Sequence, residues 1–460
     1  MKLTRQQFLR GAAAGAAVVA LRPFGLSPAH AATRIQRVVS PGGIEAWFVQ
    51  DATVPLVSIE YAFAGGAAQD PPGKPGVSNV LANLLDEGAG DLDSTTFHDR
   101  LERRAIQMNF STSRDYLRGS LRMLKEDHDQ AFELLQLALS APRFDSEPVE
   151  RIRSQIGSEL RRDSTTPTTL AGNAFWQLAY GDHPYGRPSN GTLDSLATIQ
   201  VDDLRTYQRK VLARDKLKIA VVGDIDGATL GKLLDRTFGA LPAKSDLTPV
   251  PAVTAAMPPK RVQVPLDVPQ TVIVFGGPGL LRSDPDFMPA YVVNHILGGG
   301  ALSSRLYKEV REKRGLVYSV YQSLVWMNQS GVFVGSTATR ADRAAETAAT
   351  VDSEIRRMAE QGPTQQELDE AKSYLKGSQA LALDTSSKIA SVMVQYQLDN
   401  LGIDYLDKRG ALIDTVSLDD ARRAAKRLWG QGLLMAAAGR STEASAKPAP
   451  TDAAPPTDKN

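Results

Sequence analysis

The side chains that bind transition metals most readily, cysteine and histidine, are scarce in this sequence. The chain has no cysteine, which excludes disulfide bonds, thiol catalysis and cysteine-type zinc sites. No two histidines lie three to five positions apart, so no pair of them can bind zinc from one helical face. We therefore expect no protein zinc site. The histidines are His30, His98, His128, His183 and His295.

Two distant segments carry the patterns with the most chemical meaning. Residues 73–85 read GKPGVSNVLANLL, and residues 303–319 read SSRLYKEVREKRGLVYS. Together they resemble the insulinase/pitrilysin family of zinc peptidases, the inverzincins. That family writes H-x-x-E-H in the first segment, where two imidazoles bind zinc and a carboxylate acts on the catalytic water. In the second segment it has an arginine and, seven positions later, a tyrosine, which both reach across the substrate cleft.

The resemblance identifies the first segment as a degenerate zinc motif. Asn79, Ala82 and Asn83 stand where the family has its two histidines and its glutamate. An amide is a poor zinc ligand beside an imidazole, and alanine cannot move a proton. Glu159 lies near the distance of the family's third ligand, either as a relic of the site or as part of a charged helix face. The resemblance thus implies a chain without a cofactor and without activity alone.

Arg311 and Tyr318 match the second motif, within a context that includes the glycine run 298–300 and Ser303-Ser304-Arg305-Leu306. When water adds to a peptide carbonyl, the oxygen becomes negative, and a guanidinium and a phenol hydroxyl stabilise that charge. We predict this catalytic role for the pair, in trans, at the site of a partner subunit. The alternative is a surface arginine and a half-buried strand tyrosine.

Residues 107–116 resemble the strand with which the family lines its substrate cleft. Such a strand accepts a peptide as an added strand at the sheet edge, and Asn109 and Ser111 are predicted to bind substrate. The family has a small residue after the asparagine, whereas this chain has the bulky Phe110, which we expect to hinder binding. An ordinary sheet edge is the alternative.

The apolar patterns of the two halves predict the same order of elements: strand, glycine turn, helix, glycine-rich loop, helix, strand. This repeat indicates a duplicated α+β unit. The predicted strands are 44–49, 56–63, a pair within 107–121, 217–223, 270–275 and 316–324, and the predicted helices begin around Asn79 and span 96–104, 127–139, 147–162, 287–297 and 303–313.

The resemblance and the repeat imply an α+β fold of two homologous domains, like mitochondrial processing peptidase. Each domain is expected to be a largely antiparallel sheet with helices packed on one face. We predict an N-terminal domain over 34–241 and a C-terminal domain over 263–440. A proline- and alanine-rich linker covers 242–262, and the polar segment 441–460 is expected to be a disordered tail.

Residues 1–31 have the pattern of a signal sequence. Basic residues precede an apolar run over 11–21, and Ala29-His30-Ala31 forms a small-x-small cleavage site. Residues 4–10 resemble a twin-arginine signal in which Gln6 replaces the second arginine. We predict export to the periplasm; an amphipathic N-terminal helix is the alternative. The apolar run is too short for a stable membrane span.

The charge balance argues against nucleic acid as the main partner. Lysine and arginine number 53 against 52 acidic residues, a net charge of +1, and binding of a phosphate backbone usually needs a marked basic excess. The leading hypothesis is the metal-free subunit of a heterodimeric zinc peptidase that hydrolyses peptides. Its partner would be a homologue with an intact H-x-x-E-H that carries the zinc. The alternative is a non-catalytic binding or assembly subunit of the same fold.

Overall fold

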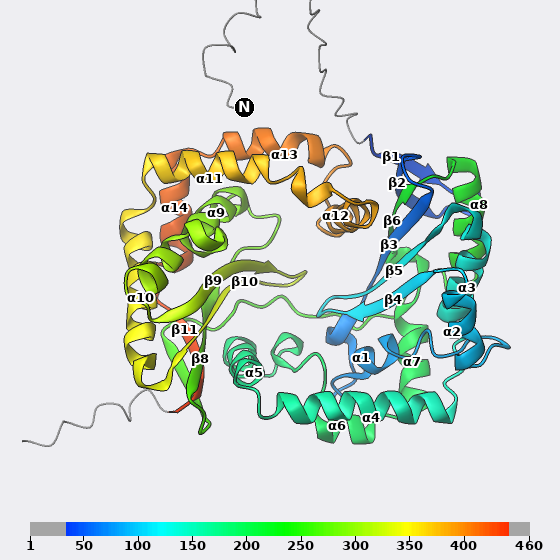
Figure 1. The fold of residues 1–460 in the computed structure, drawn as a ribbon, viewed down its shortest axis with the longest axis horizontal. Coiled ribbons are helices and arrows are strands. Elements are labelled where there is room, and N and C mark those ends of the chain that lie inside the picture. Colours follow the sequence, from blue (N-terminus) through cyan, green and yellow to red (C-terminus); the bar gives the residue numbers. More distant parts are fainter. Residues whose placement is uncertain (1–33, 441–460) are drawn as a thin grey trace, which may run out of the picture. The chain divides into compact units, whose positions relative to one another are not determined.

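The computed structural model describes residues 34–440, so the predicted signal sequence and tail lie outside the described residues. A sheet in the first half of this region has the strand order β1-β2-β6-β3-β5-β4 (Figure 1). Within it β2 and β6 pair in parallel and the other neighbours are antiparallel. Its strands are β1 (Gln36–Val39), β2 (Glu45–Gln50), β3 (Leu56–Ala64), β4 (Gln107–Thr112), β5 (Tyr116–Leu124) and β6 (Lys218–Gly223).

The second half repeats this topology in a sheet of order β7-β11-β8-β10-β9. Here β7 and β11 form the parallel pair, and the other neighbours are antiparallel. The strands correspond one to one with β2, β6, β3, β5 and β4. The predicted α+β fold of two homologous domains is confirmed, with β1, β7, β10 and β11 as strands that the sequence pattern did not reveal. The strands are β7 (Lys260–Pro265), β8 (Gln270–Pro278), β9 (Val317–Trp326), β10 (Gly331–Arg340) and β11 (Leu434–Gly439).

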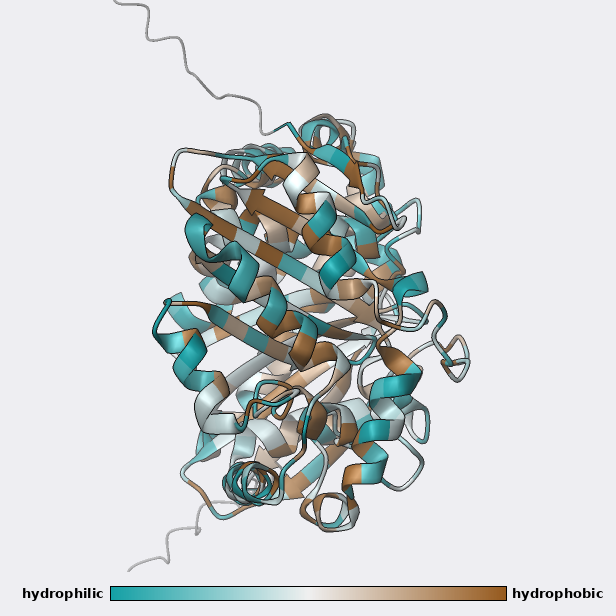
Figure 2. Ribbon diagram, turned by 90° about the vertical axis from the view of Figure 1, so that its right-hand side faces the viewer, coloured by the Kyte–Doolittle hydropathy of each residue, from teal (hydrophilic) through white to brown (hydrophobic). Residues whose placement is uncertain are grey.

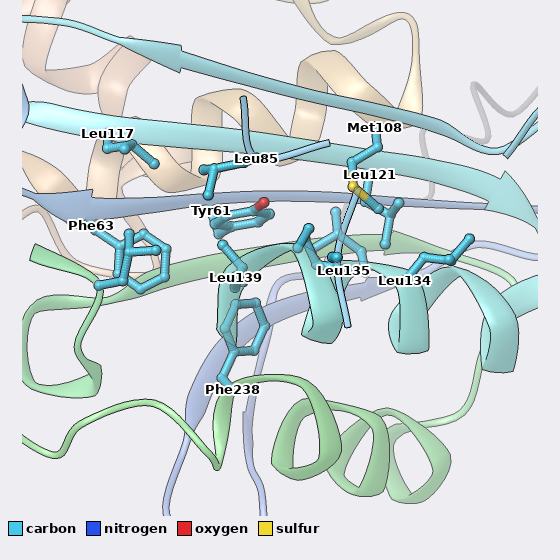
Figure 3. Close-up of a cluster of buried hydrophobic side chains, with 14 of the residues drawn as sticks. Tyr61, Phe63, Leu85, Met108, Leu117, Leu121, Leu134, Leu135, Leu139 and Phe238 are labelled. Carbon is cyan, nitrogen blue, oxygen red and sulfur yellow. The ribbon is translucent and has the colours of Figure 1, made fainter. Parts of the chain in front are cut away.

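The first half buries one face of its sheet under its own helices. Figure 3 shows this core, in which Tyr61 and Phe63 of β3 meet Leu135, Leu139 and Phe238. The helices are amphipathic, with hydrophilic and hydrophobic residues alternating along them (Figure 2), because one side faces the sheet and the other faces water. They are α1 (Val77–Ala82), α2 (Ser94–Glu102), α3 (His128–Ser140), α4 (Ser146–Asp163), α6 (Leu193–Thr198), α7 (Val201–Val211) and α8 (Gly227–Phe238).

The second half has an equivalent core, centred on Phe275 of β8, Phe333 of β10 and Trp429. Its helices α9 and α14 contact each other, as do α10 and α14. Within residues 34–440, no helix is long and apolar enough to cross a bilayer. The helices of this half are α9 (Phe287–Asn294), α10 (Ala344–Gln361), α11 (Gln365–Gly377), α13 (Tyr405–Asp414) and α14 (Leu418–Trp429).

The two halves exchange one helix each. Helix α5 (Pro167–Tyr180) of the first half packs on β7, β8 and β11 of the second. Reciprocally, α12 (Ser386–Leu398) packs on β3 and β6 of the first half (Figure 1). Each sheet therefore has its own helices on one face and a helix of the other half on the opposite face. The central strands are buried on both faces, which ties the halves into one compact unit.

The predicted linker lacks helix or strand up to Lys260 but is held in place. The amide of Val253 donates to the carbonyl of Gln329 at 3.0 Å, and the amide of Ala256 donates to the carbonyl of Ala179 at 2.7 Å. Ala255 is buried in the same cluster as α5 and β11. The segment thus contributes to the contact between the halves as well as connecting them.

Replacing Glu60 by glutamine is expected to raise stability at pH 8 and to remove one pH-dependent contribution to it. Glu60 lies on the face of β3 that α12 covers, since its neighbour Ser58 contacts Ser387 of α12 at 3.1 Å. Burial raises the pKa of Glu60 to about 7, against a smaller lowering by Arg118. The folded state then holds a proton that the unfolded state releases, so stability falls as the pH rises from about 4.5 to about 7.

Because Glu60 is partly exposed, solvent screening reduces the effect of its pKa shift on stability. Above pH 7 we therefore expect the free energy of unfolding of Glu60→Gln to exceed that of the unmodified chain by about 1 to 2 kcal/mol. Below pH 4.5 the two should converge. Denaturant unfolding at several pH values measures this difference. Glu133→Gln on the exposed side of α3 is the control and should change nothing. A constant difference across the pH range would show that Glu60 does not titrate in this window.

Candidate functional site

Helix α1 presents the degenerate motif, and the sequence around it fixes where the helix begins. Gly76, just before the helix, has a φ of 98°, and a Cβ there would lie 2.8 Å from the Cα of Gly191. Only glycine fits this left-handed, crowded position. The carboxylate of Asp70 then accepts hydrogen bonds from the amides of Gly76, at 2.7 Å, and Ser78, at 2.8 Å. Burial raises the pKa of Asp70 to about 6, although these hydrogen bonds lower it.

The motif side chains on α1 are engaged in local contacts. The Nδ2 of Asn83 donates to the backbone carbonyl of Asn79 at 2.9 Å, and the Nδ2 of Asn79 donates to the carbonyl of Asn190 at 3.5 Å. Ala82 is only 3% exposed and offers no polar atom. The two amides therefore lie next to each other, as two histidines at these positions would, but act as hydrogen-bond donors to carbonyls.

Glu159 does not complete a metal site. It is exposed on α4, where it accepts a hydrogen bond from Gln155, one turn earlier, at 3.3 Å. Among residues 34–440, no three histidine, aspartate or glutamate side chains are grouped so that they could hold a metal ion. The three motif positions on α1 carry two amides and a methyl group. Zinc is bound by imidazole, thiolate or carboxylate side chains, so these residues do not fit it.

Other acidic residues after α1 serve the structure. Burial raises the pKa of Asp86. Burial acts in the same direction on its neighbour Glu87, but hydrogen bonds from Arg151 and from Ser94, at 2.6 Å, outweigh it and lower that pKa. Glu87 therefore anchors α2 and α4 as an ionised, paired carboxylate.

Arg311 and Tyr318 lie side by side in the second half. Arg311 is on a π-helical segment (Tyr307–Glu312), and Tyr318 is near the start of β9, after a turn at Gly315. The guanidinium carbon of Arg311 is 4.8 Å from the ring centre of Tyr307 and 5.6 Å from that of Tyr318. Arg311 also donates a hydrogen bond to the hydroxyl of Tyr307. Two aromatic rings thus hold the guanidinium.

The guanidinium of Arg311 and the hydroxyl of Tyr318 both remain available to a ligand. Tyr318 is 84% exposed, and within the described part of the chain its hydroxyl has no hydrogen-bond partner. Arg311 is half-buried, and no carboxylate of residues 34–440 forms an ion pair with it. π-Helical segments are rare and occur frequently at functional sites. Sequence reasoning did not single out Tyr307, although its position one turn before Arg311 is a signal for contact.

Strand β4 places the predicted substrate-binding residues at a sheet edge. It pairs with β5 on one side, and Asn109 and Ser111 are exposed. The side chain of Phe110 is half-buried and packs against the core of the first half, which also contains Met108, and its hindrance of peptide binding stays a prediction. Alternation along the strand directs Phe110 inward and Asn109 outward.

The predicted site residues form two groups. Strand β4 contacts α1, so Asn109 and Ser111 belong to the same region as the degenerate motif. Arg311 and Tyr318 form the second group, and across residues 34–440 no hydrogen bond or ion pair joins them to α1.

Comparison with known proteins finds matches over both halves of the chain. Residues 47–193 match the model of insulinase (peptidase family M16), and residues 198–375 match that of the peptidase M16 inactive domain. The non-peptidase homolog YmxG of Helicobacter pylori is 28% identical over 76% of this chain and 81% of its own. An uncharacterized zinc protease of Streptomyces coelicolor is 27% identical over 87% of this chain and 89% of its own.

Solved structures show the same architecture. A crystal structure of a peptidase M16 inactive domain from Pseudomonas fluorescens has a TM-score of 0.83 at 27% identity, and covers 89% of this chain and 98% of that one. A protease from Helicobacter pylori has a TM-score of 0.79 at 18% identity, over 88% of this chain and 99% of that one, which shows a shared fold. The chain thus belongs to the insulinase (M16) peptidase family, as a member whose α1 lacks the side chains that bind zinc.

Proposed function

We propose that this chain is the metal-free subunit of an exported, heterodimeric zinc peptidase, and that it supplies Arg311 and Tyr318 to its partner's active site. The observation that carries the proposal is the contrast between the two groups of residues. Helix α1 has no side chain that could bind zinc, whereas the arginine and tyrosine are held together and remain accessible.

The pair acts on the charge that develops during peptide hydrolysis. As water adds to the scissile carbonyl, its oxygen becomes negative and accepts hydrogen bonds from the guanidinium of Arg311 and the hydroxyl of Tyr318. Tyr307 holds the guanidinium in place, so that little reorganisation is needed. The partner, a homologue with an intact H-x-x-E-H, carries the zinc and supplies the nucleophile.

The peptide substrate adds to the edge of β4. The unpaired side of this strand offers backbone amides and carbonyls to an extended peptide, and the exposed Asn109 and Ser111 contact its side chains. Hydrolysis takes place in the periplasm, to which residues 1–31 direct the chain. A chain without cysteine is also protected from disulfide mispairing in that compartment.

Affinity purification of the tagged chain from its own host tests the proposal. A homologue with an intact H-x-x-E-H should co-purify, and the complex should contain zinc by elemental analysis and cleave peptides. The isolated chain should contain no stoichiometric zinc and cleave none. Stoichiometric zinc in the isolated chain, lost on Glu159→Gln, would contradict the proposal.

The alternative is a binding or assembly subunit with no part in proteolysis. The similarity to a non-peptidase homolog favours this candidate, because that name describes a relative without peptidase activity. The two functions differ in the partner. A complex in which no subunit carries an intact H-x-x-E-H would support the assembly subunit.

A further inference from the structure

The second half contains a cavity of about 290 Å³ that the proposed peptidase role does not use. It lies between α9, α12 and α13, at the end of β9 that is remote from Tyr318. The segment that connects α11 to α12 closes one side of the cavity with Ala382 and Leu383. Aromatic rings line much of its interior, and they belong to Phe287, Tyr291, Trp326, Tyr396 and Tyr405.

Two arginines and one aspartate supply the charges in this cavity. Arg282 lies 4.3 Å over the ring of Phe287, and its Nη2 donates to the hydroxyl of Tyr405 at 2.6 Å. Its Nε is 3.8 Å from Asp399, so this arginine has a carboxylate counterion. Asp399 in turn accepts hydrogen bonds from Trp326 at 2.9 Å and from Gln395 at 2.8 Å. The charges of Arg282 and Asp399 balance.

Arg409 is the unbalanced charge. Its guanidinium donates to the carbonyl of Leu375 at 3.0 Å, to Gln379 at 3.2 Å and to the hydroxyl of Tyr291 at 3.3 Å. All three acceptors are neutral, and Arg409 forms no ion pair with a carboxylate of residues 34–440. A half-buried guanidinium without a counterion attracts an anion that can accept two parallel hydrogen bonds.

We propose that this cavity binds a monocarboxylate with an aromatic or branched apolar body, its carboxylate on Arg409 and its body against the aromatic wall. One net positive charge suits one carboxylate rather than a phosphate with two negative charges. The size and the mostly apolar lining match those of small-ligand sites. The acid is either a free organic acid or the C-terminal residue of a peptide.

Binding of this ligand would also hold the halves together. Helix α12 contributes Gln395 and Tyr396 to the cavity, and Asp399 directly follows it, while Ala390, Met393 and Val394 of the helix pack on the sheet of the first half. A ligand that contacts α12 stabilises its position on β3 and β6, so we expect an increase in the melting temperature with ligand concentration.

N-acetyl-L-phenylalanine and its uncharged amide are the probes. Calorimetric titration of the full chain should show saturable binding of the acid and at least about tenfold weaker binding of the amide. Acetyl-Ala-Ala-Phe with a free carboxylate distinguishes the two sources of the ligand. Tighter binding of this tripeptide indicates a peptide C-terminus, and equal or weaker binding indicates a free acid.

Two variants locate the site. Arg409→Met keeps an unbranched apolar stem and removes the guanidinium with its charge, and it should weaken binding of the acid about tenfold or more. Ala382 is exposed and lies in none of the hydrophobic core clusters, so Ala382→Phe places a ring against the cavity from its closing side and should abolish binding even if Arg409→Met fails to fold. Arg205→Met, at a surface arginine of α7, is the matched control. Absence of saturable binding, equal affinity for acid and amide, or unchanged binding in Ala382→Phe would each overturn the proposal.

Discussion

Tyr318→Phe is expected to lower the turnover of the zinc-loaded complex by about a hundredfold to a thousandfold, while leaving assembly and peptide affinity nearly unchanged. The substitution deletes one hydroxyl from a ring that is 84% exposed, so no packing is lost. Loss of a single oxyanion donor raises the barrier by roughly 3 to 4 kcal/mol. Arg311→Ala removes the second donor and should have an effect of similar size. Steady-state kinetics of the purified complex measures both.

Tyr321→Phe is the matched control, because Tyr321 is on the same strand, is 55% exposed and has no place in the proposed site. Its turnover should equal that of the unmodified complex. Since Arg311 and Tyr318 address the same charge, the double variant should lose less than the sum of the two single losses. Unchanged turnover in both single variants would eliminate the proposal that Arg311 and Tyr318 act at the partner's active site. The assembly subunit would then be the better candidate.

Much of the fold follows from local sequence patterns. Strands β3 and β6 and helices α3 and α4 form within two residues of their predicted bounds, because alternation and helical periodicity are properties of short segments. The proximity of Arg311 and Tyr318 could also be predicted, since a short turn at Gly315 is all that separates their elements. Alternation in β4 would also have predicted that Phe110 turns toward the core of the first half, where it is half-buried.

The exchange of helices could not be predicted in this way. The periodicity of α5 shows that one side is apolar but does not show which sheet covers it. A partial signal was present in the central strands, since runs such as Val272 to Phe275 are apolar without alternation. Such runs are typical of strands buried on both faces. Arg409 and its cavity depend on five elements that meet only in the folded chain, so local patterns carry no signal for them.

Phe175→Ala is expected to lower the free energy of unfolding by about 3 to 5 kcal/mol. Although Phe175 belongs to the first half, we expect the sheet of the second half to become less protected. Phe175 is on α5, in the first half, and is fully buried in a hydrophobic cluster that includes Ala436, Ala438 and Val274 of the second sheet. Removing the ring leaves a cavity between α5 and that sheet. Denaturant unfolding measures the loss, and hydrogen exchange should show faster exchange of the β8 and β11 amides.

Phe132→Ala separates this effect from a general loss of stability. Phe132 is equally buried, but α3 packs it within the core of the first half, so exchange should rise first in β5. Met393→Ala on α12 is the reciprocal change and should loosen β3 and β6 of the first half. If Phe175→Ala leaves the protection of β8 and β11 unchanged while total stability falls, α5 does not hold the second sheet. Faster exchange of β8 and β11 in Phe175→Ala, together with faster exchange of β3 and β6 in Met393→Ala, would instead show that each half depends on the helix it receives from the other.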